Sequence, residues 1–253
     1  MNLIADLHTH TMASGHAYST LMENITCAKE KNLLFMGISE HAPALEDAPK
    51  ETWFRNLKVV HNDWGDLKVL RGAELNILNE YGDADLCDET LSLLHYCIAS
   101  LHYPVFPKNK LSRCTDAAIA AMSNPSVFIL GHPDDDLMPL DYEALTLAAK
   151  FHHVALEVNN SSLCPGSFRQ GAAGNYYRML ALARKLEVPV IVSSDSHICY
   201  DIGNFARASA LLAELSFPEE LVVNSSAKRF AEFWECRKIA ALSGSDRRLK
   251  SAV

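Results

Sequence analysis

The 253-residue sequence predicts one α/β domain, a closed or nearly closed (β/α)7 barrel. Seven short apolar runs are typical of parallel strands that are buried on both faces. Segments with helical periodicity separate them, and about 250 residues is the usual length of such a barrel. A polar residue follows every run, which favours a barrel over a doubly wound open sheet, because an open sheet concentrates its site at one switch point.

The strands are predicted from the positions of these apolar runs. In chain order they cover residues 3–7, 33–38, 69–73, 96–101, 127–131, 154–158 and 190–192. The polar residues at or just beyond their ends are His8, Glu40 with His41, Glu74, His102, His132, Asn159 and Asp195.

Amphipathic helices are predicted between the strands, from apolar residues spaced three or four apart. They cover residues 21–31, 116–122 with Thr115 as the N-cap, 141–150 and 175–186. Strands that alternate with helices in this way imply right-handed βαβ units.

The C-terminal part predicts two further helices, at residues 206–215 and 225–241. The second carries an aromatic docking face, formed by Phe230, Phe233 and Trp234. We expect residues 1–242 to form the barrel domain and residues 243–253 to be a frayed tail.

Composition narrows the class of protein. With 23 basic and 31 acidic residues the net charge is −8, which argues against a nucleic-acid partner. No signal segment is apparent, and no apolar run approaches the roughly 18 residues that cross a bilayer. The seven cysteines form no CxxC pair, as expected of reduced thiols. We therefore expect a cytoplasmic protein without a membrane partner.

Two pairs of metal-ligand residues mark the two ends of the predicted barrel sequence. His8 and His10 follow the first strand, and Asp195 and His197 follow the last. Residues two apart in an extended strand point to the same side, so each pair directs two donors at one place. Imidazole nitrogen and carboxylate oxygen are ligands of zinc and similar divalent ions.

The other strand ends add ligands to the same rim, because active sites of parallel barrels lie at the carboxyl ends of their strands. These further candidates are His41, Glu74, His102, His132 and, from the loop after the first strand, His16. A single histidine is more often structural, but nine ligand residues on one rim predict a metal centre with enough donors for three sites. No dinucleotide-binding, Walker-type or GxSxG motif competes with this reading.

The strand-end motifs resemble those of the PHP (polymerase and histidinol phosphatase) domain family. They are DLHTH at 6–10, SEH at 39–41, GAE at 72–74, SLH at 100–102, GHP at 131–133 and SSDSH at 193–197. They occur in the family's order and span nearly the whole chain. The match is best with the stand-alone, YcdX-like bacterial phosphatases, which implies a distorted (β/α)7 barrel that holds three zinc ions.

The resemblance also implies how the ligands divide among three ions. The implied sets are His8, His10, Glu74 and Asp195; Glu74, His102 and His132; and His16, His41 and His197. Glu74 would then bridge two ions, and Glu74 and Asp195 would be the catalytic carboxylates. Zinc is expected, with manganese and iron as alternatives that such ligands also accept.

The expected reaction is hydrolysis of a small phosphate monoester by a metal-bound hydroxide. Two alternatives share the motifs in part: a PHP-type phosphodiesterase or nuclease, and an amidohydrolase-type metal hydrolase. The amidohydrolases usually bridge two metals with a modified lysine at the end of the fourth strand, where this chain has His102. A non-catalytic metal-stabilised module is a third alternative. The physiological substrate and the oligomeric state stay open.

Two further residues are candidates for supporting roles. Asp6 has the same strand parity as His8 and His10, so it either accepts a ligand's second N–H or lies at the bottom of the barrel. Arg169, after the sixth predicted strand, either recognises phosphate with its planar guanidinium or is a solvated loop residue.

Overall fold

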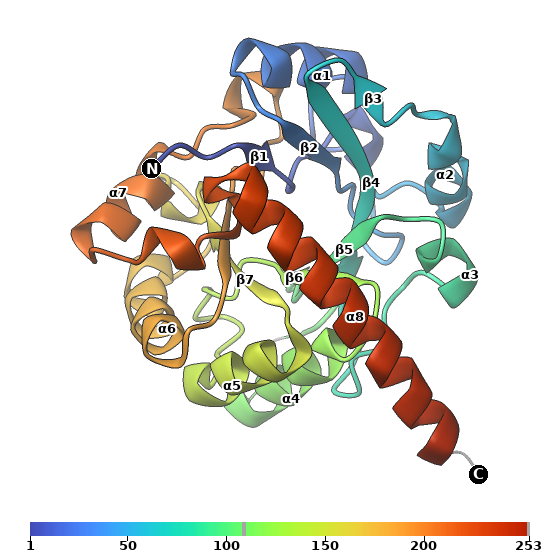
Figure 1. Cartoon of the computed structure of the whole chain (residues 1–253). Coiled ribbons are helices and arrows are strands. Elements are labelled where there is room, and N and C mark those ends of the chain that lie inside the picture. The colour runs from blue at the N-terminus through green and yellow to red at the C-terminus, as the bar shows by residue number, and fades with distance from the viewer. Residues whose placement is uncertain (108–109, 252–253) are drawn as a thin grey trace.

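The parallel strands form a sheet that curves into a nearly closed barrel, with helices around its outside (Figure 1). The computed structural model describes residues 1–107 and 110–251. Its strands are β1 (Ala5–Asp6), β2 (Phe35–Ile38), β3 (Asp63–Trp64), β4 (Leu67–Asn76), β5 (Tyr96–Ser100), β6 (Val127–Leu130), β7 (Ala155–Asn159) and β8 (Val190–Ser193). The order β1-β2-β4-β5-β6-β7-β8 is parallel throughout, as predicted for a (β/α)7 barrel.

The additional strand, β3, was not predicted. Its two residues pair antiparallel with the start of β4, through a turn at Gly65, whose φ of 84° suits glycine. β4 accordingly begins at Leu67, two residues before the predicted start. A two-residue strand is too short to show a periodic pattern.

The helices occupy most of the predicted segments. They are α1 (Leu21–Glu30), α2 (Glu51–Asn56), α3 (Asp88–Leu91), α4 (Leu111–Met122), α5 (Tyr142–His152), α6 (Ala172–Leu186), α7 (Ala206–Glu214) and α8 (Ala227–Ser251). The predicted cap at Thr115 is wrong: α4 starts at Leu111, five residues before the predicted start, and the Thr115 hydroxyl donates to the carbonyl of Leu111 within the helix. Asp141, the first residue of a predicted helix, instead caps α5 by accepting from the N–H groups of Glu143 and Ala144.

Helix α8 covers the amino-terminal mouth of the barrel, which it crosses diagonally in Figure 1. Phe230 stacks on Phe35 at the start of β2, with ring centroids 4.3 Å apart. The ring centroid of Trp234 lies 4.7 Å from that of Phe128, at the start of β6. These residues join the inward-facing apolar side chains of the strands in one core cluster, which confirms the predicted docking face. A second cluster fills the layer between the sheet and the outer helices.

The C-terminal boundary lies within this helix. α8 continues to Ser251, so residue 243, where the tail was predicted to begin, falls inside it. The division into 1–242 and 243–253 stays a prediction, and residues 252–253 lie outside the described range. Among the helices of the described chain, none has the length and apolar content needed to cross a bilayer.

The barrel closes between β8 and β1 by side chains more than by a backbone ladder. A single bridge joins Thr9 to Ser196. The buried Asn224 side chain lies between the strands: its amide donates to the carbonyls of Ala5 at 2.7 Å and Val192 at 2.8 Å, and its oxygen accepts from the N–H of Val192 at 3.2 Å. One asparagine thus substitutes for ladder bonds at the point where the barrel is distorted.

Candidate metal centre

The carboxylate of Glu74 is the centre of the site. Glu74 lies near the carboxyl end of β4 and is fully buried. Its Oε1 is 2.9 Å from Nε2 of His132, 3.2 Å from Nε2 of His102 and 3.3 Å from Nε2 of His8. Three histidines from the ends of three different strands therefore surround one carboxylate oxygen.

Asp195 approaches the same centre from the end of β8. Its Oδ1 lies 3.4 Å from Nε2 of His8 and 3.3 Å from Nε2 of His10. Asp195 has a φ of 55° and His132 a φ of 27°. Such left-handed backbone is costly for residues other than glycine and is concentrated at functional sites.

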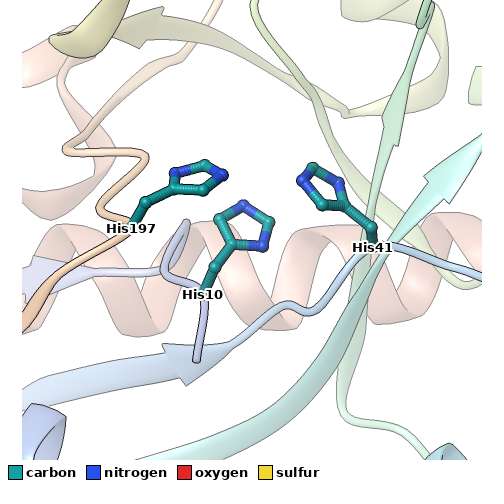
Figure 2. Close-up of side chains that lie close together, drawn as sticks. All are labelled: His10, His41 and His197. Atoms are coloured by element: carbon teal, nitrogen blue, oxygen red, sulfur yellow. The ribbon is translucent and has the colours of Figure 1, made fainter. Parts of the chain in front are cut away.

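A third group consists of histidines. The rings of His10, His41 and His197 point toward one another from three separate segments (Figure 2). The ring centroid of His10 is 4.2 Å from that of His41 and 4.5 Å from that of His197. His16 is adjacent, with its Nε2 3.2 Å from Nε2 of His41. All nine predicted ligand residues thus lie together at the carboxyl ends of the strands.

The donors of this cluster fit a divalent metal. Several buried ligand atoms lie close to one another, with His41 Nδ1 2.6 Å from Glu74 Oε2, yet make no hydrogen bond of good geometry within the described chain. They are His8 Nε2, His10 Nε2, His41 Nδ1, His102 Nε2 and Glu74 Oε2. Leaving so many buried polar atoms unsatisfied is costly, and native proteins rarely do so without a reason. Imidazole nitrogens and carboxylate oxygens within 4.8 Å of one another are the donor set that zinc and similar ions use.

Neighbouring side chains fix the ring orientations. Nδ1 of His8 lies 2.7 Å from Oε1 of Glu157, and Nδ1 of His102 lies 2.7 Å from Oδ1 of Asn76. In each ring the hydrogen bond at Nδ1 leaves Nε2 facing the centre. A hydrogen bond at one ring nitrogen sets the tautomer of a histidine that binds metal through the other. Sequence reasoning missed Glu157 and Asn76. A glutamate inside the apolar run 154–158 was the available signal.

Asp6 does not orient a ligand. Its carboxylate accepts from the N–H groups of Ser194 at 3.1 Å and Gly203 at 2.8 Å, and so ties β1 to the segment after β8. Of its two expected roles, the bond to a ligand histidine is therefore wrong. Glu40 was also missed: its buried carboxylate accepts from the N–H of Thr11 and the hydroxyl of Ser14, which holds the loop between His10 and His16.

Arg169 is buried at the site, so the alternative that it is a solvated loop residue is wrong. Its side chain is 7% exposed, and its guanidinium donates to Oδ2 of Asp195 at 3.0 and 3.1 Å and to Ser162 at 3.0 Å. Burial would lower the pKa of Arg169, but Asp195 and Asp134 beside it raise that pKa above its ordinary value, so the cation is retained.

The electrostatics keep both carboxylates ionised. Burial would raise the pKa values of Glu74 and Asp195, but neighbouring charges outweigh it and hold both well below their usual range. His8 is the largest of these neighbouring charges for both carboxylates, and Arg169 is the next largest for Asp195. Burial lowers the pKa of His132 to about 4, so this ring is neutral at pH 7 and free to bind a metal.

Curated relatives resemble nearly the whole chain. A protein of Clostridium acetobutylicum named "Probable phosphatase" is 39% identical over 237 residues, covering 94% of this chain and 96% of the relative. Another of that name, from Shewanella amazonensis, is 38% identical over 238 residues and covers 94% of each chain. The chain belongs to this phosphatase family. It is therefore an enzyme of the phosphatase class. No family model matches the chain.

Solved structures share the fold at low sequence identity. The histidinol phosphate phosphatase of Lactococcus lactis, solved with zinc, L-histidinol and phosphate, has a TM-score of 0.57 and 14% identity, covering 85% of this chain and 94% of its own. A chain of an archaeal ribonuclease P solved with mature tRNA has a TM-score of 0.55 and 19% identity, covering 93% and 91%. Barrels of this shape thus occur in proteins with different partners, so for this phosphatase the function must be argued from the site.

Proposed function

We propose that this phosphatase is a PHP enzyme of the stand-alone, YcdX-like type. It hydrolyses phosphate monoesters of a small molecule with three bound divalent ions, zinc in the first place and manganese or iron as alternatives. The observation that carries the proposal is the convergence of unsatisfied, buried imidazole and carboxylate atoms around Glu74.

The proposed ligand sets divide the nine clustered residues among three ions as the family resemblance implies. They are His8, His10, Glu74 and Asp195; Glu74, His102 and His132; and His16, His41 and His197. The short distances from Glu74 Oε1 to three rings support a carboxylate shared between two ions. The third set contains no carboxylate, so an ion there keeps its full charge and suits a phosphate oxygen.

The chain's own groups prepare the site for a phosphate dianion. When bound, divalent ions supply Lewis acidity and a hydrolytic nucleophile from water near neutral pH. Among the nine proposed ligands, Glu74 and Asp195 bring only two negative charges. Arg169 adds a cation whose position is set by its two bonds to Asp195, and we propose that it also binds a phosphate oxygen. Apolar side chains of α8 cover the opposite mouth of the barrel.

The alternatives have weaker support. An amidohydrolase-type site would place a bridging lysine at the end of the fourth strand of the barrel, and here that position holds His102, bonded to Asn76. A nucleic-acid substrate fits poorly with a net charge of −8. The cytoplasmic location stays a prediction from the sequence.

The test compares an aryl phosphate monoester with the matching diester. The protein is stripped with a chelator, and zinc or manganese is then restored. Metal-dependent hydrolysis with a clear preference for the monoester is the expected result. A preference for the diester would replace the proposal with the phosphodiesterase alternative. Bound metal with amide-bond cleavage and no phosphatase activity would favour the amidohydrolase alternative.

A further inference from the structure

Strand β7 is unusual because none of the nine predicted ligands comes from it. Its inner face instead carries Glu157 and Asn159, two residues apart and therefore on the same side. Both side chains are fully buried. A charged residue in this position needs partners, and the partners are parts of the candidate metal centre.

One carboxylate contacts two ligand residues that belong to different proposed sets. Oε1 of Glu157 lies 2.7 Å from Nδ1 of His8, which follows β1. Oε2 accepts from the backbone N–H of His132, which follows β6, at 2.6 Å. Glu157 thus orients the ring of one ligand and holds the main chain of the other.

The bond to His132 acts at a strained position. With a φ of 27°, His132 lies outside the backbone regions that non-glycine residues favour. Such residues persist only where the surrounding structure holds them in place. The Glu157 carboxylate that accepts from the His132 N–H is one such restraint. It holds the His132 ring so that Nε2 lies 2.9 Å from Oε1 of Glu74.

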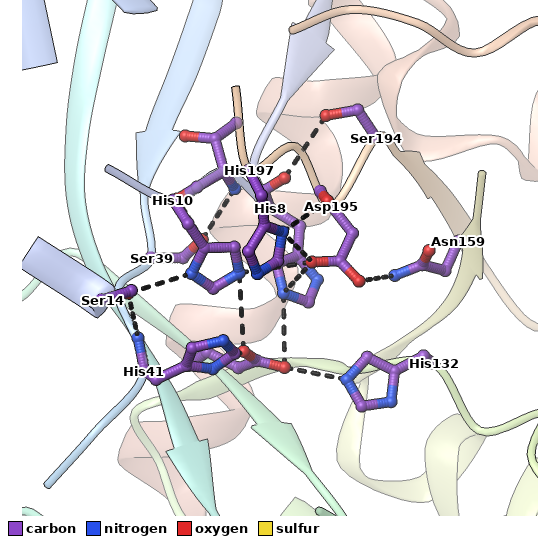
Figure 3. A network of polar contacts seen from close by, with 12 residues as sticks. His8, His10, Ser14, Ser39, His41, His132, Asn159, Ser194, Asp195 and His197 are labelled. Carbon is purple, nitrogen blue, oxygen red and sulfur yellow. Dashed lines mark hydrogen bonds and ion pairs between the residues drawn. The ribbon is translucent and has the colours of Figure 1, made fainter. Parts of the chain in front are cut away.

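Asn159 extends the arrangement to a third ligand. Its Nδ2 lies 3.0 Å from Oδ2 of Asp195, a contact drawn in Figure 3, and 3.2 Å from Oε2 of Glu157. Its own N–H donates to the hydroxyl of Tyr176 at 2.8 Å, which fixes the end of β7. The strand without ligands therefore contacts ligands from β1, β6 and β8.

We propose that Glu157 is a positioning residue that couples two metal positions, the one bound by His8 and the one bound by His132. This inference rests on the proposed metal centre. Because both ligands depend on one carboxylate, its loss weakens both positions together, while the His16, His41 and His197 position keeps its ion.

The experiment measures zinc binding to full-length protein and does not depend on turnover. Chelator-treated wild type, Glu157→Gln and Asp6→Asn are titrated with zinc against a chromophoric chelator, and bound zinc is counted after dialysis. Glutamine keeps the shape but loses the charge that both contacts use. Asp6→Asn is the matched control, since Asp6 is an equally buried carboxylate that bonds backbone N–H groups of non-ligand residues.

We expect Glu157→Gln to lose about tenfold to a hundredfold in affinity at two positions together, and Asp6→Asn to keep its affinities. Unchanged affinities in Glu157→Gln, or weakening at one position alone, would overturn the coupling. If Glu157→Gln does not fold, Asn159→Ser decides: weaker zinc binding at these positions supports the inference, and wild-type affinities overturn it. A wild type that binds no zinc would instead refute the metal centre itself.

Discussion

At the scale of single residues, Glu74 is the group whose loss should matter most for activity. Glu74→Gln keeps the volume of the side chain but removes the charge at the point where three rings converge. We expect the variant to fold and its kcat/KM for an aryl phosphate to fall by about a hundredfold or more, since the proposed bridging ligand is lost. A folded variant with near wild-type turnover would rule out the bridging role. Glu46→Gln, an exposed glutamate, is the control.

The buried carboxyl group of Asp6 should make the stability of the protein depend on pH, independently of catalysis. Burial raises its pKa from 3.8 to about 6. The folded protein therefore holds this proton more tightly than the unfolded chain, so the contribution of Asp6 to stability falls as pH rises from about 4 to about 6. The difference of roughly two pH units corresponds to about 3 kcal/mol.

The measurement is urea unfolding of wild type and Asp6→Asn, both in chelator, between pH 4 and pH 7. Relative to wild type, the variant should gain free energy of unfolding as pH rises through this range. A constant difference between the two proteins would show that Asp6 keeps an ordinary pKa.

At the scale of elements, the junction of β1 and β8 depends on Asn224. Asn224→Ala leaves the N–H and carbonyl of Val192 and the carbonyl of Ala5 without these bonds. Each unsatisfied buried group costs about 1–3 kcal/mol, so we expect a loss of roughly 2–4 kcal/mol in the free energy of unfolding after partial relaxation. Urea titration checks this, with the exposed Asn62→Ala as control. A loss below about 0.5 kcal/mol would mean that the strands close without this side chain.

At the scale of the whole molecule, the sequence predicted the barrel and its rim because both depend on simple periodicity. Parallel strands appear as apolar runs, and residues able to bind metal follow them, so all nine predicted ligand residues could be placed on one rim before the fold was known. Glu157 and Asn224 could not be assigned in this way, because their roles come from contacts with residues 149 and 219 positions away. β3 was missed for a different reason: two residues carry no pattern.

The same rim predicts how metal should affect the stability of the whole barrel. The proposed ligands come from the ends of β1, β2, β4, β5, β6 and β8, segments that the unfolded chain does not hold together. Ions that bind only the native state stabilise it by mass action, by about 2.7 kcal/mol when the free metal concentration is a hundred times its Kd. Chelation should therefore lower the melting temperature of wild type, and restored zinc should recover it.

Glu74→Gln separates this effect from general salt or chelator effects. Because this variant lacks the carboxylate shared by two proposed ligand sets, its melting temperature should respond less to chelation than that of wild type. An equal response in the two proteins would place the stabilising ions elsewhere in the molecule. No response in either protein would mean that the rim residues stabilise the fold without metal, and the buried imidazoles would then need another explanation for their missing partners.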